Sequence, residues 1–119
     1  MKVRCTSLKD WRGQPEKRSS WLKEGGTYHV LRVQIGPTRT MLQLVGEEPT
    51  PALFQPEIFE IVSSLVPETW IVASGSPGHL EFAPAAWTAP GFWESYFDGD
   101  PEAVRCFHEE RDKIVACDP

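Results

Sequence analysis

The side chains best suited to chemistry in this sequence are aromatic and acidic, and they gather near residue 95. Within eight positions lie a tryptophan, a tyrosine and three acidic residues: Trp93, Glu94, Tyr96, Asp98 and Asp100. Tryptophan and tyrosine offer large, rigid contact areas that dominate many protein-binding surfaces, and carboxylates attract basic partners. This cluster therefore predicts a surface that binds another protein.

Trp11 is a second candidate for contact with a partner. It lies in a polar stretch, residues 7–20, that contains Gly13 and Pro15 and is expected to form a long loop. The ordinary role of each of the five tryptophans is core packing. An exposed tryptophan in a long loop would instead be available to a ligand.

Groups for catalysis or metal binding do not assemble into a recognisable site. The histidines are scattered, and His108 with Asp112 on one helix face supplies only two ligands. Residues 74–78 are typical of a hairpin turn and lack the spacing of a nucleophile elbow. No glycine-rich phosphate-binding motif occurs. We therefore predict no enzymatic activity, no metal and no cofactor.

Charge is distributed unevenly along the chain. Residues 1–35 carry eight basic and three acidic side chains, whereas residues 36–119 carry four and fourteen, for a net charge of −5. Lys9, Arg12, Lys17 and Arg18 surround Trp11, and basic groups interleaved with aromatic ones can bind single-stranded nucleic acid. The domain as a whole is acidic, with a pI near 5.1, so we expect a protein partner rather than nucleic acid.

The cysteine count and the hydropathy of the sequence indicate the cellular compartment. An odd count of three cysteines, with no signal-peptide pattern in residues 1–10, predicts reduced thiols in the cytoplasm. No apolar run approaches the roughly 20 residues of a membrane-spanning helix, so we expect no membrane contact. The sequence leaves the oligomeric state open.

A length of 119 residues fits one domain. Alternating or β-branched stretches predict strands over residues 2–6, 27–35, 40–45 and 58–62, a helical turn over 53–57, and short strands over 70–73 and 79–82. Residues 91–97 space their aromatic side chains as a helix does. A longer helix is expected after them, with Asp100 as its N-cap and Pro101 at its first position. The predicted fold class is α+β, mostly β.

Two motifs resemble parts of a known fold. Residues 22–31 read Leu-Lys-Glu-Gly-Gly-Thr-Tyr-His-Val-Leu and look like a long second barrel strand with its entry turn. Residues 54–62 read Phe-Gln-Pro-Glu-Ile-Phe-Glu-Ile-Val and look like a helical turn and a closing strand. Residues 1–62 thus resemble small bacterial SH3-like β-barrel proteins of uncharacterised function. The resemblance implies a small antiparallel barrel over residues 1–62, with residues 63–119 adding a β-hairpin and two helices packed on it.

The whole chain also resembles small acidic immunity proteins, which neutralise bacterial toxins inside the cell. That resemblance implies a non-enzymatic domain that binds a basic toxin, and the cluster around Trp93 is our candidate surface. The alternative is an SH3-like adaptor or regulatory module that binds a peptide beside Trp11, because the long loop borders the peptide groove of such barrels. A domain of unknown function is the remaining interpretation.

Overall fold

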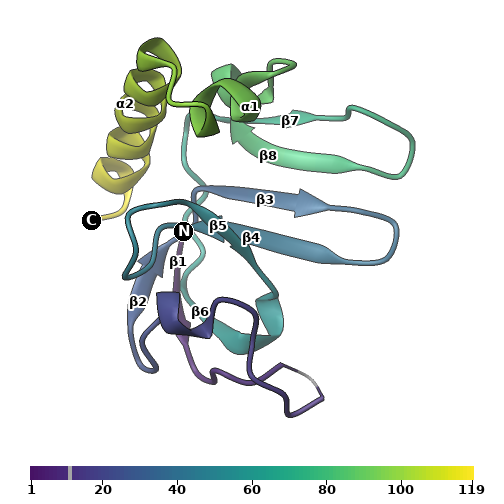
Figure 1. The fold of residues 1–119 in the computed structure, drawn as a ribbon, viewed down its shortest axis with the longest axis vertical. Coiled ribbons are helices and arrows are strands. Elements are labelled where there is room, and N and C mark those ends of the chain that lie inside the picture. The colour runs from purple at the N-terminus through teal and green to yellow at the C-terminus, as the bar shows by residue number, and fades with distance from the viewer. Residues whose placement is uncertain (11) are drawn as a thin grey trace.

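The chain folds into two antiparallel sheets and two α-helices, an α+β architecture (Figure 1). The computed structural model describes residues 1–10 and 12–119. The smaller sheet has the order β2-β1-β6, with bounds Thr27–His29, Lys2–Cys5 and Phe59–Ser63. The larger sheet has the order β5-β4-β3-β8-β7, with bounds Ala52–Phe54, Thr40–Leu44, Arg32–Ile35, Leu80–Pro84 and Trp70–Ala73.

The predicted strand over residues 27–35 bends and serves both sheets. Its first part, β2, pairs with β1, and its second part, β3, pairs with β4. At the bend, the N–H of Val30 donates to the carbonyl of Met1 (3.0 Å) and the N–H of Leu31 donates to that of Gln43 (2.8 Å). Both apolar side chains are buried, so the bend is fixed by hydrogen bonds and by packing.

The first hydrophobic core fills the space between the two sheets. Its most deeply buried members are Val3, Val30, Leu44, Phe54 and Ile58. Phe54 ends β5, a strand that the sequence did not predict because Pro56 favours a turn there. The structure places both features in succession, with β5 followed by a 3₁₀ turn η2 over Pro56–Ile58. Pairing of Phe54 with Leu42 on β4 carries its ring into the core.

The second half extends the larger sheet rather than only covering it. The predicted hairpin forms as β7 and β8, and β8 pairs with β3 through Val33 and Phe82. After β8 come a 3₁₀ turn η3 (Ala85–Thr88) and the helices α1 (Phe92–Phe97) and α2 (Pro101–Cys117). Both predicted helices are confirmed.

A second hydrophobic core joins the hairpin to the helices. It consists of five buried residues: Leu31, Ala83, Trp87, Phe107 and Ile114. The rings of Trp87 and Phe107 stack with centroids 5.1 Å apart. Within the described residues, the two sheets share no strand pairing that would close a barrel, and neither helix is long and apolar enough to cross a membrane.

Candidate functional site

Helix α1 places two large aromatic side chains against the larger sheet. Gly91 begins it with φ near +81°, a conformation that favours glycine, and Trp93 and Phe97 follow one turn apart. Trp93 is half-buried, whereas Phe97 is 57% exposed. Such exposure of a phenylalanine beside a packed tryptophan is a common property of protein-binding surfaces.

A groove of about 430 Å³ separates α1 from the 3₁₀ turn η1 (Ser19–Trp21). Residues from both walls and from strands β3, β4 and β5 line it: Arg18, Trp21, Arg32, Gln34, Gln43, Leu53, Trp93 and Phe97. The groove therefore combines three aromatic rings with a polar floor. That composition suits one apolar side chain of a partner together with its main-chain polar groups.

Gly46 positions the Trp21 wall. A Cβ atom at residue 46 would overlap the carbonyl oxygen of Trp21, so only glycine permits this close approach. The same carbonyl accepts a hydrogen bond from the N–H of Glu47 (2.7 Å), and the Arg18 guanidinium lies 5.5 Å from the Trp21 ring centroid. The loop after β4 thereby holds η1 beside the sheet.

Arg32 forms the centre of the groove floor and is only 7% exposed. Its Nε donates to Oε1 of Gln43 (3.1 Å), and its Nη1 donates to Oε2 of Glu81 (2.9 Å). The guanidinium carbon lies 4.8 Å from the ring centroid of Trp93. These contacts fix a buried positive charge under α1 and tie the helix to the sheet.

Trp93 belongs to the floor and the core more than to the surface. Its ring centroid lies 5.5 Å from that of Trp87 and 6.0 Å from that of Phe107, and its buried Nε1 atom has no hydrogen-bond partner among the described residues. The sequence predicted an exposed anchor at this position. The exposed aromatic side chain of α1 is Phe97, one helical turn further on.

Glu94 and Asp98 flank the aromatic face of α1. They lie four residues apart, so they share one side of the helix next to Trp93 and Phe97. Both are exposed and neither forms an ion pair within the described part of the chain. Asp98 ends the helix, where a negative charge is unfavourable to the helix dipole. The stability of α1 therefore does not explain why residue 98 is an aspartate.

The two other predicted residues of this cluster have roles in the fold. Asp100 caps α2, because its carboxylate accepts a hydrogen bond from the N–H of Ala103 (3.0 Å). Tyr96 is half-buried with its ring 4.8 Å from that of Phe107, and burial raises the pKa of its hydroxyl. Trp11, the remaining predicted residue, lies outside the described residues.

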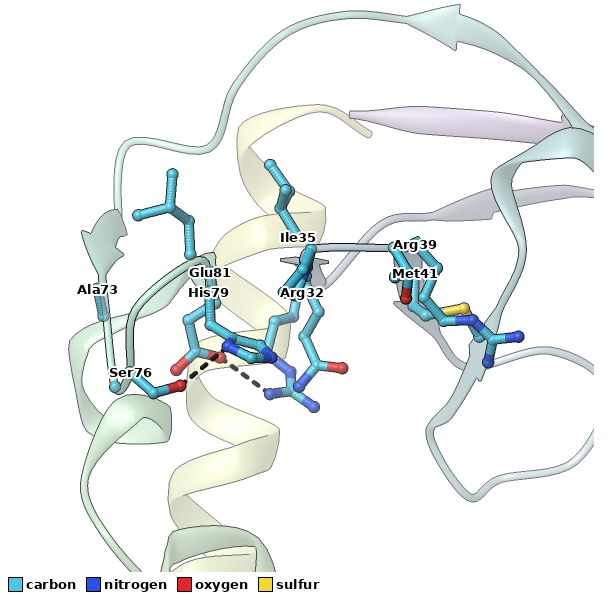
Figure 2. A pocket seen from close by; sticks show the side chains of 14 residues that line it. Arg32, Ile35, Arg39, Met41, Ala73, Ser76, His79 and Glu81 are labelled. Carbon is cyan, nitrogen blue, oxygen red and sulfur yellow. Dashed lines mark hydrogen bonds and ion pairs between the residues drawn. The ribbon is translucent and has the colours of Figure 1, made fainter.

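A second cavity of about 500 Å³ lies between the tips of the β3–β4 and β7–β8 hairpins (Figure 2). It shares Arg32 and Gln34 with the groove, so both open on the same face of the larger sheet. Oγ of Ser76 lies 2.9 Å from Nδ1 of His79, and Ser74 Oγ donates to the His79 carbonyl (2.9 Å). These contacts hold the predicted hairpin turn closed.

Sequence reasoning missed Arg32 and Phe97 as site residues. Arg32 carried one signal, because it is a charged residue within the apolar run from Val30 to Val33. Phe97 carried none that separates it from the other aromatic residues of its helix. Within residues 1–10 and 12–119, no group of three or more histidine, cysteine, aspartate or glutamate side chains is arranged to hold a metal ion.

Comparison of this chain with protein-family models, curated proteins and solved structures finds no match.

Proposed function

We propose that this chain is a non-enzymatic protein-binding domain whose partner docks on α1 and the adjoining groove. The observation that carries the proposal is the groove itself, in which the exposed ring of Phe97 lies 6.1 Å from that of Trp93 and which Trp21 also lines. A partner side chain inserted between these rings would be shielded from water on several sides. Well-packed aromatic sites of this kind supply most of the binding energy in protein interfaces.

We propose a basic partner, because the carboxylates beside the groove have no counter-ions of their own. Glu94 and Asp98 are exposed and unpaired in the described chain, and the protein carries a net charge of −5. Complementary charge accelerates association and makes it sensitive to salt. A small acidic domain that captures a basic protein in this way fits the role of an intracellular immunity protein that neutralises a basic toxin.

A peptide-binding SH3-like module is the second candidate, and the strand connections favour it. Three features of the fold support this candidate: the strand that bends at Val30 and Leu31, the pairing orders β2-β1-β6 and β5-β4-β3, and the 3₁₀ turn before β6. The far wall of the groove, Arg18 and Trp21, comes from the end of the long loop that borders the peptide site in such barrels. A peptide would then occupy the same groove.

Co-expression with the protein encoded immediately upstream of this chain tests the proposal. We expect a stoichiometric complex that weakens steeply as salt is raised. Phe97→Ala should lower the affinity by about tenfold or more, as truncation of an interface aromatic does. Val66→Ala is the matched control, since Val66 is 61% exposed but lies on the segment between β6 and β7.

The outcomes of this experiment distinguish the basic partner from the peptide ligand. A salt-sensitive complex lost in Phe97→Ala and kept in Val66→Ala supports the basic partner. A salt-insensitive complex with the same response to Phe97→Ala supports peptide recognition in the groove. Equal binding by both variants and the wild type would exclude α1 as the docking surface.

A further inference from the structure

We propose that protonation of Glu16 holds residues 15–20 against Leu8 and Lys9, and that ionisation of this carboxyl releases them. Glu16 is only 6% exposed, and its buried Oε2 atom has no hydrogen-bond partner among the described residues. Burying a carboxylate with an unsatisfied oxygen is costly, whereas the protonated group carries no charge. The closed position of this segment therefore favours the protonated form.

Main-chain hydrogen bonds fix the backbone of Glu16 in the closed position. Its N–H donates to the carbonyl of Leu8 (2.8 Å), and its carbonyl accepts a hydrogen bond from the N–H of Ser19 (2.9 Å). An isolated β-bridge joins Lys9 to Pro15, the residue before Glu16. These bonds hold the backbone in the position that buries the carboxyl, so we expect ionisation of the carboxyl to weaken them.

Arg18 adds backbone strain to the same segment. Its φ is near +60°, and it is the only non-glycine residue with a positive φ in the part of the chain that the structure describes. The next residue, Ser19, begins η1, and Arg18 gives this turn no side-chain cap. Opening of the segment would relieve both the strain at Arg18 and the burial of Glu16.

The segment ends at a fixed point. The carbonyl of Trp21 accepts a hydrogen bond from the N–H of Glu47 (2.7 Å), which anchors the Trp21 wall of the groove. Arg18 also lines the groove but lies inside the segment. Release should therefore move Arg18 and leave Trp21 in place.

Burial and nearby charges together set the pH at which the segment opens. Burial raises the pKa of Glu16 most, and the carboxylates of Asp10 and, on η2, Glu57 raise it further. The N–H of Lys17 and the guanidinium of Arg39, on the turn between β3 and β4, lower it in part. A carboxyl whose pKa is raised in the closed state stabilises that state at low pH, and this stabilisation is lost as pH rises through the raised value.

Hydrogen exchange of the free protein, from mildly acidic to mildly alkaline pH, tests the inference. The amide of Ser19 reports the segment, and the amide of Val30, which donates to the Met1 carbonyl (3.0 Å), reports the core. After correction for the intrinsic pH dependence of exchange, we expect protection of Ser19 to fall by about tenfold as pH rises, with Val30 nearly unchanged. Glu16→Gln keeps the shape of the side chain without its charge and should abolish this pH dependence. Glu48→Gln, the matched control, alters an exposed glutamate and should behave as the wild type does.

Two exposed neighbours carry the test if Glu16→Gln fails to fold. Glu57→Gln removes a charge that disfavours ionised Glu16, so the change in Ser19 protection should move to lower pH. Arg39→Met removes a charge that favours ionised Glu16, so the change should move to higher pH. A purely structural role for residues 15–20 predicts no such opposite shifts.

Three results would overturn the inference. Protection of Ser19 that does not vary with pH in the wild type is the first, and equal variation in Glu16→Gln is the second. The third is a shift of the same sign in Glu57→Gln and Arg39→Met. All three are measured without a partner, so they leave the proposed function to the separate test with Phe97→Ala.

Discussion

The two hydrophobic cores of this protein differ in side-chain composition and in the elements that they position. The first core is mainly aliphatic and lies between two sheets, around residues such as Val3, Leu44 and Ile58. The second is centred on the stacked rings of Trp87 and Phe107 and lies between the sheet extension and the helices. The first core holds the sheets together, while the second determines where α1, and therefore the groove, is placed.

The cores are adjacent but not separate. Trp70 at the start of β7 packs against both, and the bent strand contributes Val30 to the first core and Leu31 to the second. Loss of one core should therefore weaken the other. We nevertheless expect the groove to respond more to the second core, because α1 contacts only that one through Phe92, Trp93 and Tyr96.

The largest expected effect comes from truncating a ring in each core. Phe107→Ala and Phe54→Ala both remove a fully buried phenylalanine, and each should lower the unfolding free energy by about 3–5 kcal/mol. Phe107 contacts the rings of Trp93 and Tyr96, at 6.0 and 4.8 Å between centroids. Urea unfolding gives the stabilities, and near-ultraviolet circular dichroism follows the tryptophan environment.

The comparison between these two variants is decisive when both are measured while still folded. Phe107→Ala should lose the tryptophan signal and partner binding, whereas Phe54→Ala should keep binding despite a similar loss of stability. Equal loss of binding in both variants would show that the position of α1 does not depend on the second core more than on the first.

Arg32 joins the sheet to α1, and its removal should have a smaller effect. Arg32→Met leaves Glu81 and Gln43 without their donor and should cost about 2 kcal/mol, less than a fully buried pair because Glu81 is partly exposed. Arg105→Met is the matched control. Arg105 forms an exposed pair with Glu109 within α2, so its loss should cost about 0.5 kcal/mol or less. Thermal unfolding of both variants checks the difference, and equal costs would remove Arg32 from this role.

The smallest effect is expected at the chain ends, where polar contacts join the two termini. Asp118 accepts a hydrogen bond from Ser63 Oγ (2.6 Å) and lies 3.0 Å from the Met1 ammonium group. The hydrogen bond from Ser63, followed by the ammonium group, lowers the pKa of this carboxyl. A lowered pKa favours folding above the unfolded-state pKa, and this contribution disappears as pH falls through the folded-state value.

Asp118→Asn should therefore lower the melting temperature at neutral pH. The difference from the wild type should shrink as pH falls through the lowered pKa of Asp118. Melting curves at neutral and strongly acidic pH measure both values. A difference that stays constant with pH would mean that the hydrogen bond from Ser63 matters and the negative charge does not.

Local signals in the sequence were sufficient for most of the helices and strands, β5 excepted, but not for the groove. Asp100 and Pro101 indicated the start of α2 correctly, and this helix buries Ala103, Phe107 and Ile114. Trp21 and Trp93 are far apart in the sequence, and they line one groove because β8 pairs with β3 and Gly46 admits the Trp21 carbonyl. No local sequence pattern predicts the pairing of β8 with β3 or the close approach of Gly46 to the Trp21 carbonyl.

Local sequence patterns also did not predict which aromatic side chains of α1 are exposed. Residues 91–97 predicted a helix whose aromatic side chains share one face, and that helix forms. Which ring enters the core depends on Arg32 and Trp87, which lie under Trp93 and leave Phe97 at the rim. The sequence also does not predict that Ile71 and Val72 on β7 are exposed, because this strand is equally suited to a buried position.

The most direct test of the proposed docking surface is the association rate with the partner at several ionic strengths. Glu94→Gln combined with Asp98→Asn removes the two unpaired carboxylates beside the groove and leaves Asp100 to cap α2. Glu57→Gln combined with Glu68→Gln makes the same change of charge at two other exposed positions. We expect the first pair to slow association by about tenfold at low salt and to flatten its salt dependence, and the second to leave both nearly unchanged. Equal rates for the two double variants would contradict a basic partner docking on α1.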